Sequence, residues 1–435
     1  MTAPASEEVT ATLARSGFAA LVIKIGAAGL SFLMFLLLAR AMSAGDYGRF
    51  GFGFALATFL AYVGLLGRHH LALRFGAIYR AEKDGPRLNG LAREGYASVF
   101  LGCGGLGLIL VLAALVFARP GEQHHLLWAG FLTVALGWAE YQSHLLRTVT
   151  GMWVALAPRD LCWRALVIAL AAASALGFLP RLDAASGLLL LTLTLAAMLF
   201  VQAGLHPLTR PGNLLFAPAA ADQSPLWRRA ALGLWGNVIV QTATPNLAVV
   251  GIGLLLTPAE TGPFFAALRT AMLLSLFSLA ASMVATPLLA ARLHAGDTDG
   301  ARRICAMVAA GVGVPTLLVF LALLFWGGAA LALFNEPFAR EHPVLTVLAA
   351  GYLVNALAGP TAELLAMAGH ERALFKIMLA AHLAALVALP LAILAAGPMA
   401  AALVLASAQI GWNLIAWRWA RTRLGIDTSI FALRP

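Results

Sequence analysis

The chain has 435 residues and carries 29 Lys and Arg residues against 19 Asp and Glu residues, which gives a net charge of +10. Apolar residues make up 61% of it and charged residues only 11%, less than half the roughly 25% of a soluble domain. Because the surface of a soluble protein must be largely polar, no soluble fold can hide this much apolar surface. The composition therefore predicts a membrane protein.

Apolar segments long enough to cross a membrane recur along the whole chain. A helix needs about 20 apolar residues to span a hydrocarbon core about 30 Å thick. Since backbone groups in lipid must be hydrogen-bonded within the segment, such segments are expected to be helices. The first is longer than the 7–15-residue core of a signal peptide and is expected to remain uncleaved. The predicted fold is an all-α polytopic membrane protein with twelve spans: 17–39, 49–67, 96–118, 126–146, 161–179, 187–205, 230–256, 263–290, 304–333, 344–368, 373–396 and 399–420.

The distribution of basic residues predicts the orientation in the membrane. The two ends and the even-numbered loops carry 22 Lys and Arg residues, whereas the odd-numbered loops carry 5. Basic loops face the cytoplasm, so both termini are expected there, in a bacterial inner membrane. The positive charge then reflects topology, and no nucleic-acid partner is indicated. The longest polar stretches, 68–95 and 206–229, are expected to be cytoplasmic and too short to fold as domains.

Motifs for catalysis, nucleotides and metals are missing from the sequence. It contains no G-x-x-x-x-G-K-[ST] segment, which excludes an ATP engine of the P-loop type. The adjacent pairs His69-His70 and His124-His125 lack the spacing of a metal site on one helix face. We expect no metal, no cofactor and no catalytic residues, and hence a protein that is not an enzyme.

An internal repeat links the two halves of the chain. The segment Ser43–Phe50 follows the first span, and Thr257–Phe264 follows the seventh, at an offset of 214 residues. Each segment has a hydroxyl residue with an acid three positions later, the pattern of a capping box at a helix N-terminus. A second pair, 84–87 and 299–302, repeats at an offset of 215. The matching positions are Ser43, Asp46 and Gly48 in the first copy, and Thr257, Glu260 and Gly262 in the second.

The repeat predicts a domain organisation. Residues 1–205 form one six-helix lobe, 230–435 form a second with a cytoplasmic tail, and 206–229 link them. Because each half has an even number of spans, the copies are parallel repeats about an axis along the membrane normal. Two such lobes around a central cavity suit transport by alternating access.

The segment from Ala39 to Phe50 reads A-R-x-M-S-x-x-D-Y-G-x-F, and it resembles the start of polysaccharide-transport flippases. These belong to the multidrug, oligosaccharidyl-lipid and polysaccharide exporter superfamily. The resemblance implies a flippase that moves an undecaprenyl-pyrophosphate-linked oligosaccharide across the inner membrane, in pathways such as O-antigen, lipopolysaccharide or exopolysaccharide synthesis. The implied partners are that lipid-linked oligosaccharide, membrane lipids and other polysaccharide-assembly proteins. The chain departs from the pattern at Asn246, where many relatives carry an acid, so ion coupling there is in doubt.

Two cations inside spans are candidates for binding the substrate headgroup. Lys24 lies in the first span with Ser31 on the same face, and Arg269 lies in the eighth. Intramembrane charges cost about 2.5–3.5 kcal/mol each on insertion scales and usually face a cavity. One cation in each half suits a pyrophosphate held between the lobes. The alternative is that both side chains reach the membrane interface.

The seventh span carries a polar stripe beside a proline. Asn237, Gln241 and Thr244 share one helix face, where they suit either sugar hydroxyls or hydrogen bonds between helices. Pro245 removes a backbone hydrogen bond and is expected to bend this helix, as a gate requires.

Buried titratable residues are candidates for proton or ion coupling. Glu140 shares a face with His144 and Arg147, which favours a local ion pair. Glu363 shares a face with Asn355 and Gly359 in the tenth span. The third candidate is His382, which as a lone intramembrane histidine suits either packing or a proton relay.

Three functions fit these features, and the flippase is preferred. A cation-coupled multidrug exporter of the same superfamily should carry acids in its cavity, whereas the first span here carries Lys24. An intramembrane polysaccharide polymerase or ligase should have a sizeable outward loop with paired catalytic groups, which this chain lacks.

Overall fold

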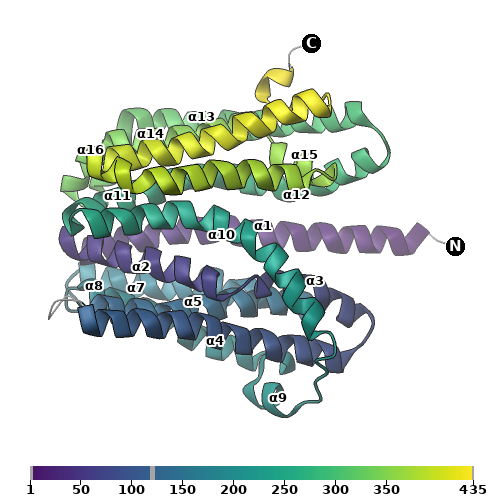
Figure 1. The fold of residues 1–435 in the computed structure, drawn as a ribbon, viewed down its shortest axis with the longest axis horizontal. Helices are drawn as coiled ribbons and strands as arrows, with labels where there is room; N and C mark the ends of the chain where they lie inside the picture. The colour runs from purple at the N-terminus through teal and green to yellow at the C-terminus, as the bar shows by residue number, and fades with distance from the viewer. Residues whose placement is uncertain (1–2, 118–122, 434–435) are drawn as a thin grey trace. The chain divides into compact units, whose positions relative to one another are not determined.

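The computed structural model describes residues 3–117 and 123–433. Within them, side chains are described from residue 19 to 432, except those of Ala20 and Asn237. All regular structure in this part of the chain is helical, as expected for an all-α polytopic membrane protein (Figure 1). The chain divides into two compact units, Met1–Val250 and Gly251–Pro435. The division falls inside a helix, and the predicted lobes 1–205 and 230–435 stay predictions.

The first unit begins with α1 (Ala3–Ala41) and continues into the helix that crosses the division, α10 (Ser224–Leu255). The α4 and α5 helices pack along each other, and α5 also packs against α2, α3 and α8. The helices between α1 and α10 are α2 (Ala44–Gly64), α3 (Arg68–Ala81), α4 (Gly85–Phe117), α5 (Gln123–Val149), α6 (Met152–Ala157), the π-helical η1 (Pro158–Cys162), α7 (Trp163–Ala175), α8 (Ala184–Gly204), η2 (Pro207–Thr209) and α9 (Pro211–Phe216).

The second unit is built on α16 (Glu371–Arg423), which packs against α14 (His342–Ala358) and α15 (Thr361–Met367). The α14 helix also packs against α13 (Thr298–Ala332). The remaining helices are α11 (Pro258–Ala271), η3 (Met272–Leu274), α12 (Ser275–His294), η4 (Glu336–Glu341) and η5 (Ile430–Leu433).

The predicted spans coincide with helical structure along most of their length. In the described residues, seven helices are long and apolar enough to cross a membrane, or nine if each of two bent pairs is one span. The bent pairs are α2 with α3, at 46°, and α14 with α15, at 47°. The 53-residue α16 contains non-helical backbone at Ala396 and Gly397. The predicted spans 373–396 and 399–420 therefore lie on either side of a break within α16.

The bend between α2 and α3 depends on a glycine. Leu66 and Gly67 have φ angles of +47° and +74°, which turn the chain out of the first helix. A Cβ atom on Gly67 would lie 2.2 Å from the carbonyl oxygen of Ala231, so no larger residue fits. The stretch 68–95, which we expected to be a polar loop, is instead helical in α3 and the start of α4. Its charged residues occur on helices because Arg, Lys and Glu favour helix formation when part of the helix surface is buried.

The break between α14 and α15 is completed by the C-terminal segment of the chain. The Thr428 hydroxyl donates to the carbonyl oxygen of Ala358 at 2.8 Å, and its oxygen lies 2.7 Å from the Thr361 hydroxyl. Gly359 has φ +72° and ψ −163°, a region open essentially to glycine alone. A Cβ atom there would lie 2.0 Å from the carbonyl oxygen of Thr428. Thr428 thus satisfies a backbone acceptor that the broken helix leaves open.

The repeated motif caps two corresponding helices. Ser43 is the N-cap of α2, where it accepts from the Asp46 backbone N–H at 3.1 Å and donates to its carboxylate at 2.6 Å. Thr257 is the N-cap of α11, and its N–H and hydroxyl both donate to Glu260, at 3.1 and 2.8 Å. Each capped helix buries the glycine of the motif, Gly48 in α2 and Gly262 in α11.

The segment before α10 is held against α4 and α3. Arg87 forms an ion pair with Asp222 at 2.8 Å, and this hydrogen-bonded pairing holds the pKa of Asp222 below its ordinary value. The Arg93 guanidinium donates to the carbonyl oxygens of Leu214 at 2.7 Å and Ala217 at 2.9 Å. Trp227 is fully buried, and its indole N–H donates to the Tyr79 hydroxyl at 2.9 Å. The predicted linker 206–229 is therefore docked on the first unit along much of its length.

We expect Gly359→Ala to lower the free energy of unfolding by about 2–5 kcal/mol, because the side chain adds backbone strain and a clash with Thr428. Gly411→Ala is the matched control, since nothing lies within 4 Å of a Cβ atom there. Thermal unfolding of the detergent-purified variants measures the difference. Equal melting temperatures for the two variants would contradict this account of the break.

Candidate functional site

Charged side chains from α1, α5, η1 and α7 form a connected group inside the first unit, here called the charged cluster. Lys24 Nζ lies 2.7 Å from Asp160 Oδ2, and Arg164 Nη1 lies 3.3 Å from Asp160 Oδ1. Arg159 Nη2 lies 2.7 Å from Glu140 Oε2, and its Nε lies 3.5 Å from Asp160 Oδ1. The members of the charged cluster are Lys24, Glu140, His144, Arg147, Arg159, Asp160 and Arg164.

A π-helical turn places the centre of this cluster. The helical run from Met152 to Ala175 is interrupted by η1, which starts at Pro158. Proline has no N–H to donate to the carbonyl oxygen of Val154, and the Gln202 amide of α8 donates to that oxygen instead at 2.8 Å. The same amide reaches the Ala155 carbonyl oxygen at 3.0 Å. The π-turn, which is common at functional sites, is thus supported from a neighbouring helix.

Arg159 and Arg164 lie in a helical run that begins earlier than predicted. Both were counted with the cytoplasmic charges when the orientation was predicted, and the span was expected to begin at residue 161. The helical run begins at Met152, so both cations lie inside it, with side chains only 18% and 16% exposed. When a helix begins before its apolar segment, the charged residues of its first turns can lie inside the helical bundle.

The charged cluster contains more cations than carboxylates. Among the described residues it has two carboxylates, Glu140 and Asp160, and four side chains of Lys or Arg. Asp160 is 2% exposed, and the Nε atoms of Arg147 and Arg164 are buried without a hydrogen-bond partner among the residues that the structure describes. Buried donors and charges are costly when unmatched. The cluster therefore has positive charge and donor capacity that an anion would satisfy.

Three histidines adjoin this cluster. The ring centroids of His69 and His70 on α3 are 4.3 Å apart, and they lie 5.1 and 5.6 Å from that of His144 on α5. His144 Nδ1 lies 2.8 Å from the Glu140 carbonyl oxygen and 3.6 Å from its carboxylate. The predicted contact of Glu140 with His144 on the same helix face is thus present, but the shortest ion pair of Glu140 is with Arg159. Within the described residues no group of His, Cys, Asp and Glu side chains is arranged to hold a metal ion.

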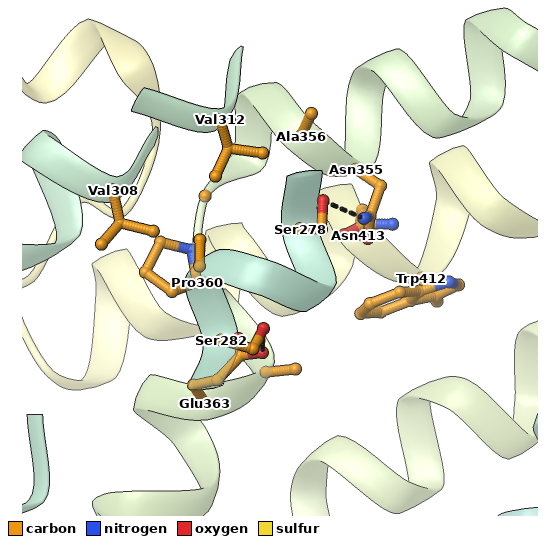
Figure 2. A pocket seen from close by; sticks show the side chains of 13 residues that line it. Ser278, Ser282, Val308, Val312, Asn355, Ala356, Pro360, Glu363, Trp412 and Asn413 are labelled. Atoms are coloured by element: carbon orange, nitrogen blue, oxygen red, sulfur yellow. Dashed lines mark hydrogen bonds between the residues drawn. The ribbon is translucent and has the colours of Figure 1, made fainter. Parts of the chain in front are cut away.

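The second unit contains a polar cavity of about 120 Å³ at the break between α14 and α15 (Figure 2). The Ser282 hydroxyl donates to Glu363, and the Asn355 amide donates to the Ser278 hydroxyl at 3.3 Å. Asn355, Gly359 and Glu363, expected to share one helix face, all line this cavity, although the helix is broken between them. The sequence did not single out the other polar lining residues, Ser278, Ser282 and Asn413.

The remaining predicted site residues are distributed over both units. The Ser31 hydroxyl donates to the Ala27 carbonyl oxygen of its own helix at 2.7 Å. Arg269 lies in the last turn of α11 in the second unit, with its guanidinium 4.7 Å above the Phe265 ring and 3.8 Å from Met272 Sδ. His382 is buried in α16.

The predicted polar stripe lies on α10. Thr244 is buried, Gln241 is exposed, and Pro245 lies inside the helix. The side chain of Asn237 lies outside the described residues. Asn246, which replaces the expected acid, donates to the Thr242 carbonyl oxygen at 2.8 Å.

Comparison with solved structures identifies the fold. The chain is similar to an inward-facing multidrug resistance MATE family transporter of the MOP superfamily, with 12% identity, a TM-score of 0.71, and coverage of 91% of this chain and 94% of that one. An outward-facing MATE family transporter gives 13% identity, a TM-score of 0.65 and 95% coverage of both chains. No family model matches the sequence. No curated protein matches it either.

A lipid-linked flippase is among the similar structures. The lipid II flippase MurJ, in an inward closed conformation, gives 13% identity, a TM-score of 0.67, and coverage of 94% of this chain and 87% of that one. The chain therefore has the fold of the MATE transporters of the MOP superfamily and of MurJ, a multi-pass membrane fold. The predicted fold is confirmed by these similar structures, and the fold does not define the substrate.

We expect Asp160→Asn to destabilise the first unit by about 3–5 kcal/mol, because it leaves Lys24 and Arg164 without their shared carboxylate. Lys24→Met combined with Asp160→Asn should recover about 1 kcal/mol or more, since one unmatched cation is removed. Thermal unfolding of the two single variants and the double variant measures this coupling. Asp299→Asn is the control, because that side chain is 79% exposed. Additive effects of Lys24→Met and Asp160→Asn would contradict the pairing.

Proposed function

We propose that the protein is a flippase for an undecaprenyl-pyrophosphate-linked oligosaccharide, and not an enzyme. The observation that carries this proposal is the excess of Lys and Arg in the charged cluster, four against two carboxylates. A pyrophosphate linkage bears about two negative charges, and guanidinium groups bind phosphate oxygens strongly. The likeness to MurJ, described as a lipid II flippase, supports a substrate of lipid-linked type.

The proposed mechanism is alternating access between the lobes 1–205 and 230–435, joined by the linker 206–229. Lys24 and Arg269 hold the headgroup, one from each lobe. Ser31 and the α10 stripe of Asn237, Gln241 and Thr244 hydrogen-bond the sugars, and Pro245 lets α10 bend as a gate. The lipid-linked oligosaccharide moves from the cytoplasmic to the outer leaflet of the inner membrane, with both termini in the cytoplasm, for surface polysaccharide assembly. The α10 roles follow from the proline and polar spacing alone.

A cation-coupled multidrug exporter is the second candidate function. The observation that favours it is the carboxylate of Glu363 in the cavity of the second unit, where an exporter would bind a cation. The MATE family transporters of similar fold are described as multidrug resistance proteins. The charged cluster favours the flippase, because its net positive charge repels the cationic drugs that such exporters carry. Growth of an expressing strain in cationic drugs separates the two candidates.

We expect Lys24→Ala to slow substrate flipping at least tenfold per molecule of folded protein, because a dehydrated pyrophosphate needs cationic partners. The measurement uses proteoliposomes with purified protein and labelled lipid-linked oligosaccharide. Lys376→Ala removes the same charge from an exposed position and should leave flipping unchanged. The double variant Lys24→Ala, Arg269→Ala should abolish flipping. Normal flipping by the double variant would remove these residues from the proposed headgroup site.

We expect an imposed membrane potential to bias the distribution of substrate between leaflets. An inside-negative potential favours outward movement of an anion by ~2.3 kcal/mol per charge per 100 mV. Protons returning through Glu363, Glu140 or His382 would add a response to a pH gradient. Glu363→Gln, which keeps a hydrogen-bonding group for Ser282, should weaken the pH response and keep the response to potential. A distribution indifferent to both gradients would show a passive facilitator.

A further inference from the structure

The inference concerns the three histidines beside the charged cluster. His69 is 1% exposed, and its Nδ1 atom has no hydrogen-bond partner in the described part of the chain. A buried imidazole nitrogen without a partner is costly and occurs where a water, proton or ligand completes the site. Neither the headgroup cations nor the proposed coupling residues account for this atom.

Backbone geometry brings the histidines together. The bend at Leu66 and Gly67 turns α3 against α5, and His69 and His70 occupy its first turn. The α3 and α5 helices pack along each other, so both rings meet His144 at centroid distances of 5.1 and 5.6 Å. Arg68, at the start of α3, is turned instead to Glu94, with which it pairs at 2.9 Å.

The charges facing the histidines are mostly positive. Glu140 is the carboxylate nearest to them, and it is already paired with Arg159 at 2.7 Å. Arg147 has a buried Nε atom with no hydrogen-bond partner within residues 3–117 and 123–433. The titratable and charged groups that act on the three histidines or on Glu140 come from five elements: Lys24 of α1, Tyr62 of α2, Glu140 and Arg147 of α5, Arg159 of η1 and Arg164 of α7.

We propose that His69, His70 and His144 form, with Arg147 and Arg159, a binding site for a pyrophosphate-type anion that takes up protons as the anion enters. This proposal rests on the proposed function and names a second contact for its headgroup. Without an anion, a positive charge on any imidazole faces two guanidinium groups and the other two rings. A doubly charged anion reverses that balance, because opposite charges at 4 Å attract strongly in a partly buried site. Each protonated ring also gains an N–H that donates to a phosphate oxygen.

The chemistry is limited to proton transfer. As the anion enters, one or more neutral imidazoles accept protons from solvent at a ring nitrogen, and no other bond forms or breaks. When the anion leaves, the rings return those protons. Binding and release of substrate would therefore be linked to the pH on the side of the membrane where each occurs, in addition to any proton that returns through Glu363.

The test measures the affinity of inorganic pyrophosphate for the purified full-length protein in nanodiscs at pH 6 and pH 8. One linked proton changes affinity about tenfold per pH unit. The triple variant His69→Gln, His70→Gln, His144→Gln is the control for the protonation of pyrophosphate itself, which affects both proteins equally. Between pH 6 and pH 8, we expect the affinity of the wild type to fall by a factor at least ten times larger than the factor for this variant. His294→Gln, at an exposed position of α12, should behave as the wild type.

Three results would overturn the proposal. The first is that pyrophosphate does not bind to the wild type. The second is that the affinities of the wild type and the triple variant change equally with pH. The third is that a single His69→Gln variant with the wild-type melting temperature shows the same pH response as the wild type. Calorimetry in buffers of different ionisation enthalpy counts the protons directly and should give fewer for the variants. Displacement of pyrophosphate by undecaprenyl pyrophosphate supports a lipid headgroup as the natural ligand, and failure to displace it supports free pyrophosphate. If the wild-type protein does not flip the lipid-linked oligosaccharide in proteoliposomes, the proposed function is wrong, whatever the number of protons taken up.

Discussion

Charge enclosed in a helical bundle has to be matched by other charge or by a ligand, and this constraint organises the first unit. Asp160 is nearly inaccessible and is contacted by side chains from α1, η1 and α7. This carboxylate therefore ties α1 to the helical run that contains η1 and α7. It cannot neutralise Lys24, Arg159 and Arg164 together, and Glu140 is committed to Arg159. The imbalance remains inside the bundle, where an anionic substrate would have the most favourable interaction.

The second unit meets a different constraint, which concerns backbone rather than charge. A helix broken in a membrane exposes carbonyl and amide groups that lipid cannot satisfy. At the break between α14 and α15, the hydroxyls of Thr428 and Thr361 donate to the Ala358 carbonyl oxygen, and Gly359 lets the Thr428 backbone approach closely. The break also turns the polar face of α15 into a small cavity with Glu363 at its wall. The same local departure from helix thus creates both the need for Thr428 and the space beside Glu363.

Local sequence patterns predicted the helices and their caps, because those depend on neighbours in the chain. The spans followed from runs of apolar residues, and the N-caps at Ser43 and Thr257 followed from an acid three positions on. The candidate site was only partly predictable. Lys24 and Glu363 stood out as charges in apolar segments, but the partner of Lys24 is 136 residues away in the sequence. No local pattern indicates that Asp160 is that partner.

The histidines show why residue pairs at helix ends are hard to interpret. His69 and His70 lie where an apolar span ends and a basic stretch begins, so the sequence predicts the start of a loop there. The structure continues as a helix because Gly67 redirects the chain while α3 still finds a surface to pack on. A polar segment that turns back onto a bundle brings its first side chains inward. Pro158 has the equivalent effect at η1, since the π-turn that begins there carries Arg159 and Asp160 into the same bundle. His69, His70 and Arg159 of the proposed anion site thus lie where a span is interrupted by a glycine or a proline, and such a residue next to charged or histidine side chains is the sequence signal for them. His144 and Arg147 lie on the uninterrupted helix α5 and have no such signal.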